Sequence, residues 1–379
     1  MAEDPIPFNH SSVVGLEYEY IRQAMESGQV AGDRTFSRRC QAMLEEVLGV
    51  PRALVTTSCT HALEMAALLL DIRAGDEVIV PSFTFVSTAN AFALRGARLV
   101  FCDVRPDTLN LDEAKLPGLI TSRTRAIVLV HYAGVACEMD VIGALAARRG
   151  IALVEDNAHG LFGKYRGRWL GTFGGLATQS FHETKNITCG EGGALLINDA
   201  RLVERAEIIR EKGTNRARFF RGQVDKYSWV DLGSSYVMSD VLAAFLFGQL
   251  EKWRDIQARR RARWEAYDSR LGAWAERTGA GRPTIPGHCE QSYHMYYLLL
   301  PDLATRTALI AHLKAQGVMA VFHYLPLHLS EFGRQWGGQP GDCPVTESIS
   351  DRLLRLPLFY AMTEQQQSRV IDAISAFRA

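Results

Sequence analysis

Ser180-Phe181-His182-Glu183-Thr184-Lys185-Asn186 places a lysine between an apolar run and the glycine-rich segment Gly190-Glu191-Gly192-Gly193. A lysine amine becomes a nucleophile toward an aldehyde when desolvation or nearby cations lower its pKa, and this requires a partly buried, tightly turned setting. The segment can supply such a setting. A lysine beside glycines is more often a solvated turn residue, so both interpretations of Lys185 stay open on this segment alone.

A second informative segment lies upstream, where the apolar run Ile151-Ala152-Leu153-Val154 leads into Glu155-Asp156-Asn157-Ala158-His159. The run predicts a strand covered on both faces, and open α/β sheets bind ligands at the carboxyl ends of their strands. Asp156 is therefore predicted to face a site, where a carboxylate can hold the proton of a pyridine nitrogen. The alternative is that Asp156 only caps the next turn or helix.

A third segment, Thr56-Thr57-Ser58-Cys59-Thr60, follows a short apolar run and opens an apolar helical pattern. Free N–H groups at a helix N-terminus, the helix dipole and hydroxyl side chains together favour a bound phosphate. An ordinary Ser/Thr cap is the alternative for this segment. The combination of all three segments favours a site for a phosphorylated, aldehyde-bearing cofactor.

The order of these segments, together with Gly75-Asp76-Glu77-Val78-Ile79-Val80-Pro81-Ser82-Phe83-Thr84-Phe85 and Leu325-Pro326-Leu327-His328, resembles the DegT/DnrJ/EryC1/StrS sugar-nucleotide aminotransferases over nearly the whole chain. The resemblance implies pyridoxal 5'-phosphate as cofactor. It also implies the α/β fold of type I (aspartate aminotransferase-like) pyridoxal-phosphate-dependent transferases. A large cofactor-binding domain with a mostly parallel sheet is expected over residues 1–250, and a smaller C-terminal α+β domain over 251–379.

Further segments resemble one branch of that family, the transaminases that form dTDP-4-amino-4,6-dideoxygalactose. These segments are His182–Asn186, Arg210–Arg216, Phe219–Tyr227 and Phe322–Tyr324. The resemblance implies a dTDP-linked 4-dehydro-6-deoxyglucose as acceptor, L-glutamate as donor, and a role in a bacterial surface polysaccharide such as enterobacterial common antigen. A 3-keto sugar, a UDP link or an equatorial C4 amine stays open as the alternative.

The family's functional residues map onto positions of this chain. Lys185 would bond the cofactor and shuttle the proton, and Asp156 would pair with the pyridine nitrogen. The other implied cofactor contacts are Cys59, Thr60 and Ser180 at the phosphate, Phe85 on one ring face, and His159 at the ring or its hydroxyl. Core packing for Phe85 and a turn role for His159 are the alternatives.

The resemblance also implies a homodimer, in which Ser235 stands where many relatives have an asparagine that reaches the partner's cofactor phosphate. A shorter serine would need a closer approach or a bridging water. The sugar pocket is predicted to contain Arg216, Tyr227, His323, Tyr324 and His328.

Strands are predicted near residues 52–57, 77–80, 98–102, 126–131, 151–154, 176–181 and 193–197, alternating with helical patterns. Leu232 to Leu250 reads as one capped, mostly apolar helix that a second subunit could cover. Lys252 to Arg270 reads as an arginine-rich amphipathic helix whose arginines form a solvated face.

Composition excludes several classes of protein. The 379 residues carry 42 basic and 42 acidic side chains, so neither a nucleic-acid footprint nor a membrane-surface charge is indicated. The seven cysteines are scattered without a Cys-x-x-Cys pair, which argues against a zinc ribbon or disulfide scaffold. No uncharged run approaches the roughly 18 residues of a membrane span, so we expect a cytoplasmic enzyme.

The sequence disfavours two other classes of function. A dinucleotide-dependent oxidoreductase or epimerase requires Gly-x-Gly-x-x-Gly after the first strand, and Thr56–Thr60 does not match it. A catalytically silent binding protein predicts a missing lysine or an added DNA-binding domain. A dehydratase branch of the family carries histidine in place of the lysine, and Lys185 argues against it.

Overall fold

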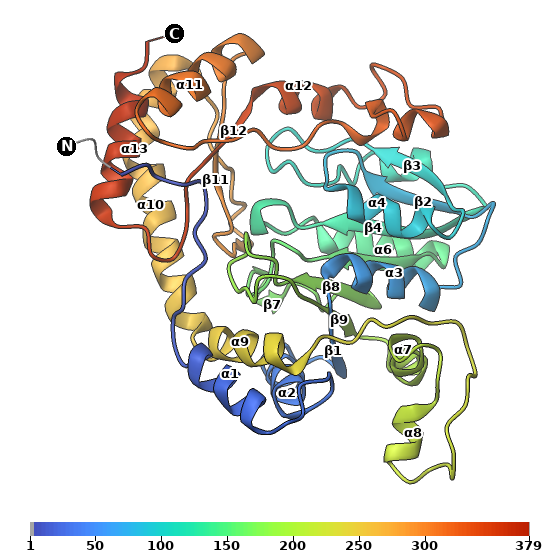
Figure 1. The fold of residues 1–379 in the computed structure, drawn as a ribbon. Helices are drawn as coiled ribbons and strands as arrows, with labels where there is room; N and C mark the ends of the chain where they lie inside the picture. Colours follow the sequence, from blue (N-terminus) through green and yellow to red (C-terminus); the bar gives the residue numbers. More distant parts are fainter. Residues whose placement is uncertain (1–3, 379) are drawn as a thin grey trace.

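A computed structural model describes residues 4–378 and shows a seven-stranded sheet at the centre of the molecule (Figure 1). The strand order is β1-β9-β8-β5-β4-β2-β3, and only β9 runs antiparallel to its neighbours. The bounds are β1 (Arg52–Thr56), β2 (Glu77–Pro81), β3 (Arg98–Cys102), β4 (Thr124–Val130), β5 (Ala152–Asp156), β8 (Leu176–Ser180) and β9 (Gly193–Ile197). All seven predicted strands are present, and the sheet is mostly parallel, as expected.

Helices cover both faces of this sheet. One face packs against α3 (Cys59–Leu69), α4 (Val86–Ala93) and α7 (Val203–Arg210), and the other against α6 (Met139–Arg149), α2 (Thr35–Leu48) and α9 (Asp240–Glu251). Helix α1 (Glu17–Glu26) lies beside α9. Burial on both faces explains why the strands read as continuous apolar runs, such as Ile127 to Leu129 in β4.

A small sheet, two short helices and several 3₁₀ turns lie between the main helices and strands. A small sheet contains β6 (Lys164–Tyr165), β7 (Arg168–Trp169) and β10 (Cys289–Glu290). The short helices are α5 (Leu116–Leu119), α8 (Arg216–Phe220) and four 3₁₀ turns at Tyr132–Gly134, Ala200–Leu202, Leu327–Leu329 and Gly333–Trp336.

The C-terminal part of the chain has a core of its own. It is built from α10 (Trp253–Thr278), β11 (Tyr296–Leu299), α11 (Leu303–Ala315), β12 (Leu353–Leu356) and α13 (Glu364–Ala376). Helix α12 (Pro344–Arg352) contacts α11 and β11. The boundary predicted at residues 250/251 stays a prediction, although α10 begins close to it.

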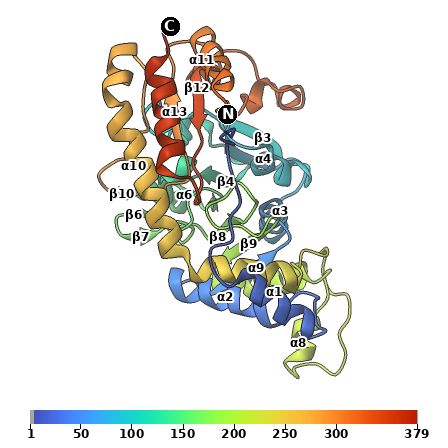
Figure 2. The ribbon, with the colours of Figure 1, turned by 60° about the vertical axis from the view of Figure 1, so that its left-hand side comes forward.

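The N-terminal segment belongs to this C-terminal core. Ile6 pairs with Val318 and is only 1% exposed. The segment then runs down past α10 to α1, as Figures 1 and 2 show. On its way the Asn9 side chain donates to the carbonyl of Glu183, 2.9 Å away. The first residues of the chain therefore connect the C-terminal core to the lysine segment.

The predicted helix from Leu232 to Leu250 is wrong over its first part, because α9 begins only at Asp240, after the Ser239 cap. The preceding residues are extended. The N–H of Lys212 donates to the carbonyl of Ser234 at 3.0 Å, so this backbone bonds across to the end of α7 rather than along a helix.

Helix α10 confirms the predicted arginine-rich helix but not its uniform solvated face. Arg260 is 3% exposed and donates to the carbonyls of Tyr293 and His294 at 3.0 and 2.5 Å. Burial lowers the pKa of Arg260 to about 9. Between residues 4 and 378, none of the helices combines the length and the apolar character that crossing a bilayer demands.

Candidate active site

A cavity of about 810 Å³ lies where the carboxyl ends of β5 and β8 meet the N-termini of α3 and α4. It gathers nine of the predicted site residues from distant parts of the sequence. These are Cys59, Thr60, Phe85, Asp156, His159, Ser180, Lys185, His323 and Tyr324. The location agrees with the general rule that ligands bind at the carboxyl ends of parallel strands.

Lys185 is held in a tight loop between β8 and β9. Its N–H donates to the carbonyl of His182 at 2.9 Å, and the N–H of Glu183 donates to that of Gly190 at 2.8 Å. Burial lowers the pKa of Lys185 to about 8. A substantial fraction of its amine is therefore neutral near physiological pH, as a nucleophilic lysine requires.

Asp156 ends β5 and is 5% exposed. The Thr88 hydroxyl donates to its Oδ2 at 2.7 Å, and the N–H of Ala158 donates to its Oδ1 at 3.2 Å. Burial raises the pKa of Asp156, while the bonds from Thr88 and Ala158 oppose that increase. The carboxylate is thus oriented and able to accept a ligand proton inside the cavity.

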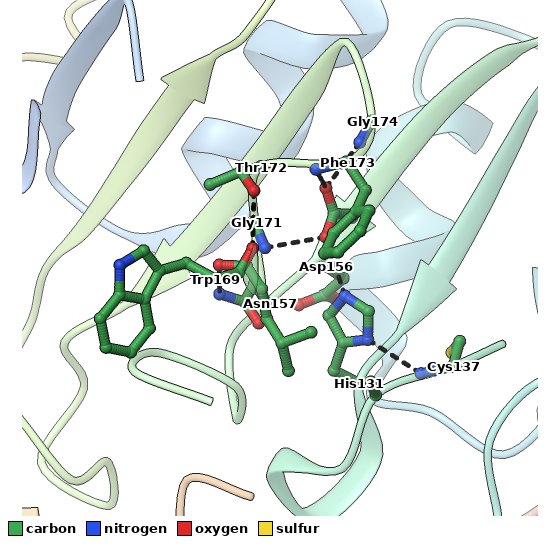
Figure 3. A network of polar contacts seen from close by, with 12 residues as sticks. His131, Cys137, Asp156, Asn157, Trp169, Gly171, Thr172, Phe173 and Gly174 are labelled. Carbon is green, nitrogen blue, oxygen red and sulfur yellow. Dashed lines mark hydrogen bonds and ion pairs between the residues drawn. The ribbon is translucent and has the colours of Figure 1, made fainter. Parts of the chain in front are cut away.

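The preceding residue, Glu155, faces the opposite side of β5 from Asp156, because successive side chains of a strand alternate. Figure 3 shows its partners His131, Gly171, Phe173 and Gly174. Its carboxylate accepts from the N–H groups of Gly171, Phe173 and Gly174 at 2.8, 2.6 and 2.6 Å. It also accepts from His131 Nε2 at 2.9 Å; the N–H of Cys137 donates to Nδ1 of the same ring. Of the two carboxylates that end the strand, only Asp156 serves the cavity.

Helix α3 presents its free N-terminus to the cavity. Its first intrahelical bond runs from the N–H of Ala62 to the carbonyl of Ser58, so the N–H groups of Cys59 and Thr60 precede the ladder. A Cβ atom at Gly193 would lie 2.4 Å from the Cys59 nitrogen, which explains the glycine at the start of β9. Burial raises the pKa of the Cys59 thiol, so this cysteine is an unreactive thiol.

A cluster of histidines forms another wall. The rings of His159 and His294 stack with centroids 4.3 Å apart, and Nδ1 of His159 is buried without a partner. The amide of Asn186 donates to the carbonyl of Ser292 at 2.7 Å, and its oxygen lies 3.0 Å from Nδ1 of His294. These two contacts place the proton of His294 on Nδ1.

His323 and Tyr324 also line the cavity, and their ring centroids lie 3.5 Å apart. The hydroxyl of Tyr132 lies 2.8 Å from Nδ1 of His323 and fixes its ring. Phe85 is 57% exposed, although it is a large apolar residue, and its ring faces the cavity. An exposed aromatic face in this position suits stacking on a planar ring.

Four predicted residues do not line the cavity. Arg216 and Tyr227 lie at and after the exposed helix α8, and Ser235 lies in the extended segment before α9. His328 is buried elsewhere, with Nδ1 2.6 Å from the Ser82 hydroxyl and Nε2 3.1 Å from Glu347. Both ring nitrogens of His328 are engaged, which is the pattern of a structural histidine.

Among the residues that the sequence predictions missed are Thr88, Tyr132, His294 and Arg355. Thr88 and Tyr132 support residues of the cavity, and His294 and Arg355 line it. A signal existed for Arg355, since it is a lone cation inside the apolar run from Leu353 to Leu358. His294 lies in a polar stretch before a strand and gave no such signal.

The residues of the cavity fit one particular cofactor. Free N–H groups suit a phosphate, Phe85 suits a flat ring, Asp156 suits a pyridine nitrogen, and Lys185 suits an aldehyde. Residues 13–375 match the model of the DegT/DnrJ/EryC1/StrS aminotransferase family. The chain belongs to this family. Membership and geometry together confirm the expected fold and indicate pyridoxal phosphate as the cofactor of this aminotransferase.

Similar proteins support the assignment to the DegT/DnrJ/EryC1/StrS family. The uncharacterized protein MJ1066 of Methanocaldococcus jannaschii is 33% identical over 341 residues, which cover 88% of each chain. The aminotransferase TlmJ of Streptoalloteichus hindustanus is 31% identical, with a TM-score of 0.90 over 98% of each chain. S. venezuelae DesV, solved in complex with a ketimine intermediate, is 30% identical, with a TM-score of 0.88 over 98% of each chain.

Proposed function

We propose that the protein transfers the amino group of L-glutamate to dTDP-4-dehydro-6-deoxy-D-glucose, forming dTDP-4-amino-4,6-dideoxy-D-galactose and 2-oxoglutarate. The observation that carries the transamination is the Lys185 amine, whose pKa is lowered to about 8 in a cavity that also holds Asp156. The choice of sugar rests on the branch-specific segments, and all three residues of one of them, Phe322, His323 and Tyr324, line the cavity.

The chain's own groups have separate tasks in this proposal. The N–H groups of Cys59 and Thr60 would hold the phosphate, and Asp156 would keep a proton on the pyridine nitrogen. Pyridoxal phosphate, when bound, supplies the aldehyde that receives the amino group and a ring that withdraws electrons. Phe85 covers one face of the site and limits the access of water.

Lys185 moves the proton. With pyridoxal phosphate bound, Nζ of Lys185 would take the proton from the donor carbon that carries the nitrogen, hold it inside the cavity and later release it. It runs the same transfer in reverse when the sugar ketone is aminated. Both substrates use the one cavity in turn, so ping-pong kinetics are expected.

A homodimer is part of the proposal. Large apolar side chains are exposed around α8 and the extended segment after it: Phe220 at 67%, Trp229 at 76%, Val230 at 51% and Leu232 at 54%. An exposed apolar patch of this kind supports a protein interface. Arg216, Tyr227 and Ser235 lie in the same region and would serve the partner's cavity.

The test is incubation of the holoenzyme with L-glutamate and dTDP-4-dehydro-6-deoxyglucose, followed by NMR of the sugar product. An axial C4 amine supports the proposed reaction. An equatorial amine or a requirement for a 3-keto or UDP-linked sugar refutes the proposed product and retains a sugar aminotransferase. Bleaching of the cofactor by glutamate without any aminated sugar refutes the proposed acceptor, and the Lys185→Ala variant serves as the control without transfer.

A further inference from the structure

The N-terminal segment, residues 5–12, is anchored at both of its ends. The N–H of Ile6 donates to the carbonyl of Gly317 in the C-terminal part of the chain at 2.8 Å. At the other end, the buried side chain of Gln249 in α9 donates to the carbonyl of Ser12 at 2.9 Å. The middle of the segment is therefore fixed between the C-terminal core and α9.

Phe8 and Asn9, in the middle of this segment, line the same cavity as Lys185. The guanidinium carbon of Arg355 on β12 lies 4.7 Å from the centroid of the Phe8 ring, which packs the segment against the C-terminal core. The side-chain amide of Asn9 donates to the carbonyl of Glu183 at 2.9 Å. Two consecutive residues thus join that core to the loop between β8 and β9 that carries Lys185, which we call the lysine loop.

The carbonyl of Glu183 takes its hydrogen bonds from the N-terminal segment and not from the lysine loop. The carbonyls of His182 and Gly190 accept from N–H groups of the loop itself. In the part of the chain that the structure describes, the donors to the Glu183 carbonyl are the Asn9 amide and, at 3.3 Å, the Ser11 hydroxyl. The shorter of these two bonds is the one from Asn9.

A hydrogen bond at Glu183 acts directly on the backbone of Lys185, two residues further along. The turn between them closes through the bond from the Lys185 N–H to the carbonyl of His182 at 2.9 Å. On the other side, the amide of Asn186 donates to the carbonyl of Ser292 at 2.7 Å. Side-chain amides from two residues therefore hold the lysine loop on both flanks of Lys185.

We infer that Asn9 is a positioning residue for the reaction, because its hydrogen bond to the Glu183 carbonyl holds the lysine loop where Nζ of Lys185 can move the proton. The inference rests on the proposed function, in which Lys185 is the reactive amine, but not on the identity of the sugar. A displacement of about 1 Å at a reacting group can lower a rate about 100-fold, so the hold on this loop matters. Asn9 acts through the backbone and needs no contact with either substrate.

The test combines two measurements on Asn9→Asp, which keeps the shape of the side chain but has no N–H to donate. The first is amide hydrogen exchange of the lysine loop in the cofactor-free protein. We expect it to become about 2- to 10-fold faster, the value of one lost neutral hydrogen bond. The second is the donor half-reaction of the holoenzyme, followed as bleaching of the cofactor by L-glutamate. Its maximal rate should fall about 2- to 10-fold, with a smaller change in the glutamate concentration for half-maximal rate.

Three other variants calibrate this result. Asn9→Gln keeps the amide and should recover part of the maximal rate. Ser11→Ala should give a smaller effect in the same direction, because its bond to the Glu183 carbonyl is longer. Ser12→Ala is the matched control and should leave both readouts unchanged, since its hydroxyl donates to the carbonyl of His10 within the N-terminal segment.

Unchanged exchange together with an unchanged maximal rate overturns the inference. Faster exchange at an unchanged rate also overturns it, because Asn9 would then support the fold without affecting the reaction. A lower rate at unchanged exchange overturns it as well and assigns Asn9 a direct contact with a ligand of the cavity. If Asn9→Asp does not fold, as judged from its melting temperature, Asn9→Ala decides by the same criteria.

The outcome is separable from that of the proposed function. Hydrogen exchange needs neither substrate, and the half-reaction needs no sugar. If no aminated sugar forms but both readouts respond to Asn9→Asp, the proposed acceptor fails and the positioning role stands. If L-glutamate does not bleach the cofactor, the rate at which the cofactor-free protein binds pyridoxal phosphate replaces the half-reaction. That rate should fall by a similar factor in Asn9→Asp, and an unchanged rate overturns the inference.

Discussion

Replacing Lys185 with methionine is expected to make the cofactor-free protein more stable at neutral pH. Methionine has a similar length and no charge, so the variant removes a buried cation and leaves the packing nearly unchanged. Most substitutions at an active-site residue would be expected to be neutral or destabilising. The opposite sign here follows from the lowered pKa of the amine.

The magnitude follows from two pKa values. The pKa of Lys185 falls from its ordinary 10.5 to about 8 in the folded protein, and each pKa unit corresponds to about 1.36 kcal/mol. Burial of the protonated amine therefore costs about 3 kcal/mol of folding free energy. Below pH 8 both folded and unfolded chains hold the proton and the cost is complete. Between pH 8 and 10.5 only the unfolded chain holds it, so the stability of the unaltered protein rises with pH.

The assay is urea unfolding of both proteins from pH 6 to 11 at one protein concentration. Lys185→Met should be more stable by about 3 kcal/mol at pH 7, and this advantage should vanish above about pH 10.5. Exposed Lys314→Met is the control and should change stability by less than about 0.5 kcal/mol at every pH. An advantage that does not change with pH, or a variant that is less stable at pH 7, would refute the reasoning.

Three further variants test other parts of the site. Thr88→Val removes the hydroxyl that lowers the pKa of Asp156, so the acid limb of the pH–rate profile should move to higher pH. An unchanged acid limb would contradict the view that the active enzyme requires ionised Asp156. Phe85→Ala should weaken cofactor binding about 3- to 10-fold, the value of a stacked aromatic contact, without lowering the melting temperature, because the ring is already exposed; fluorescence titration measures this. Glu155→Gln should lower the free energy of unfolding in urea by about 3–5 kcal/mol, since it disturbs a buried carboxylate that accepts four hydrogen bonds. A decrease of less than about 1 kcal/mol would contradict a structural role for Glu155.

The sheet and the cofactor side of the cavity were predictable from the sequence because they follow local rules. Apolar runs mark buried strands, and parallel strands bring their carboxyl ends to one edge. Asp156 ends β5 and Lys185 follows β8, and these strands are neighbours in the sheet, so the two residues had to lie close together. Their separation in the sequence was therefore no obstacle.

The other side of the cavity depends on how the C-terminal part docks, which no local pattern specifies. Arg355 and His294 reach the cavity only because β11 and β12 pair and the segment around Val321 joins them. His328 shows the reverse case. Its motif suggested a ligand contact, but long-range contacts with Ser82 and Glu347 engage both of its ring nitrogens.

The helix predicted from Leu232 failed for a related reason. Apolar residues at Leu232 and Val237 continue the pattern of α9, but the backbone of this segment pairs with strands and turns far away in the sequence. Local periodicity cannot distinguish an apolar stretch that forms a helix from one that is paired elsewhere.

The place of Ile6 in the C-terminal core has a consequence for how the protein is made. A ribosome adds about 5–20 residues per second, so roughly 15–60 s pass between the synthesis of Ile6 and that of its partner Val318. During this time the first segment has no surface on which to dock. The segment around Ile6 must therefore stay undocked in the nascent chain until Val318 and its neighbours have been synthesised, and these later segments are the ones that bind it.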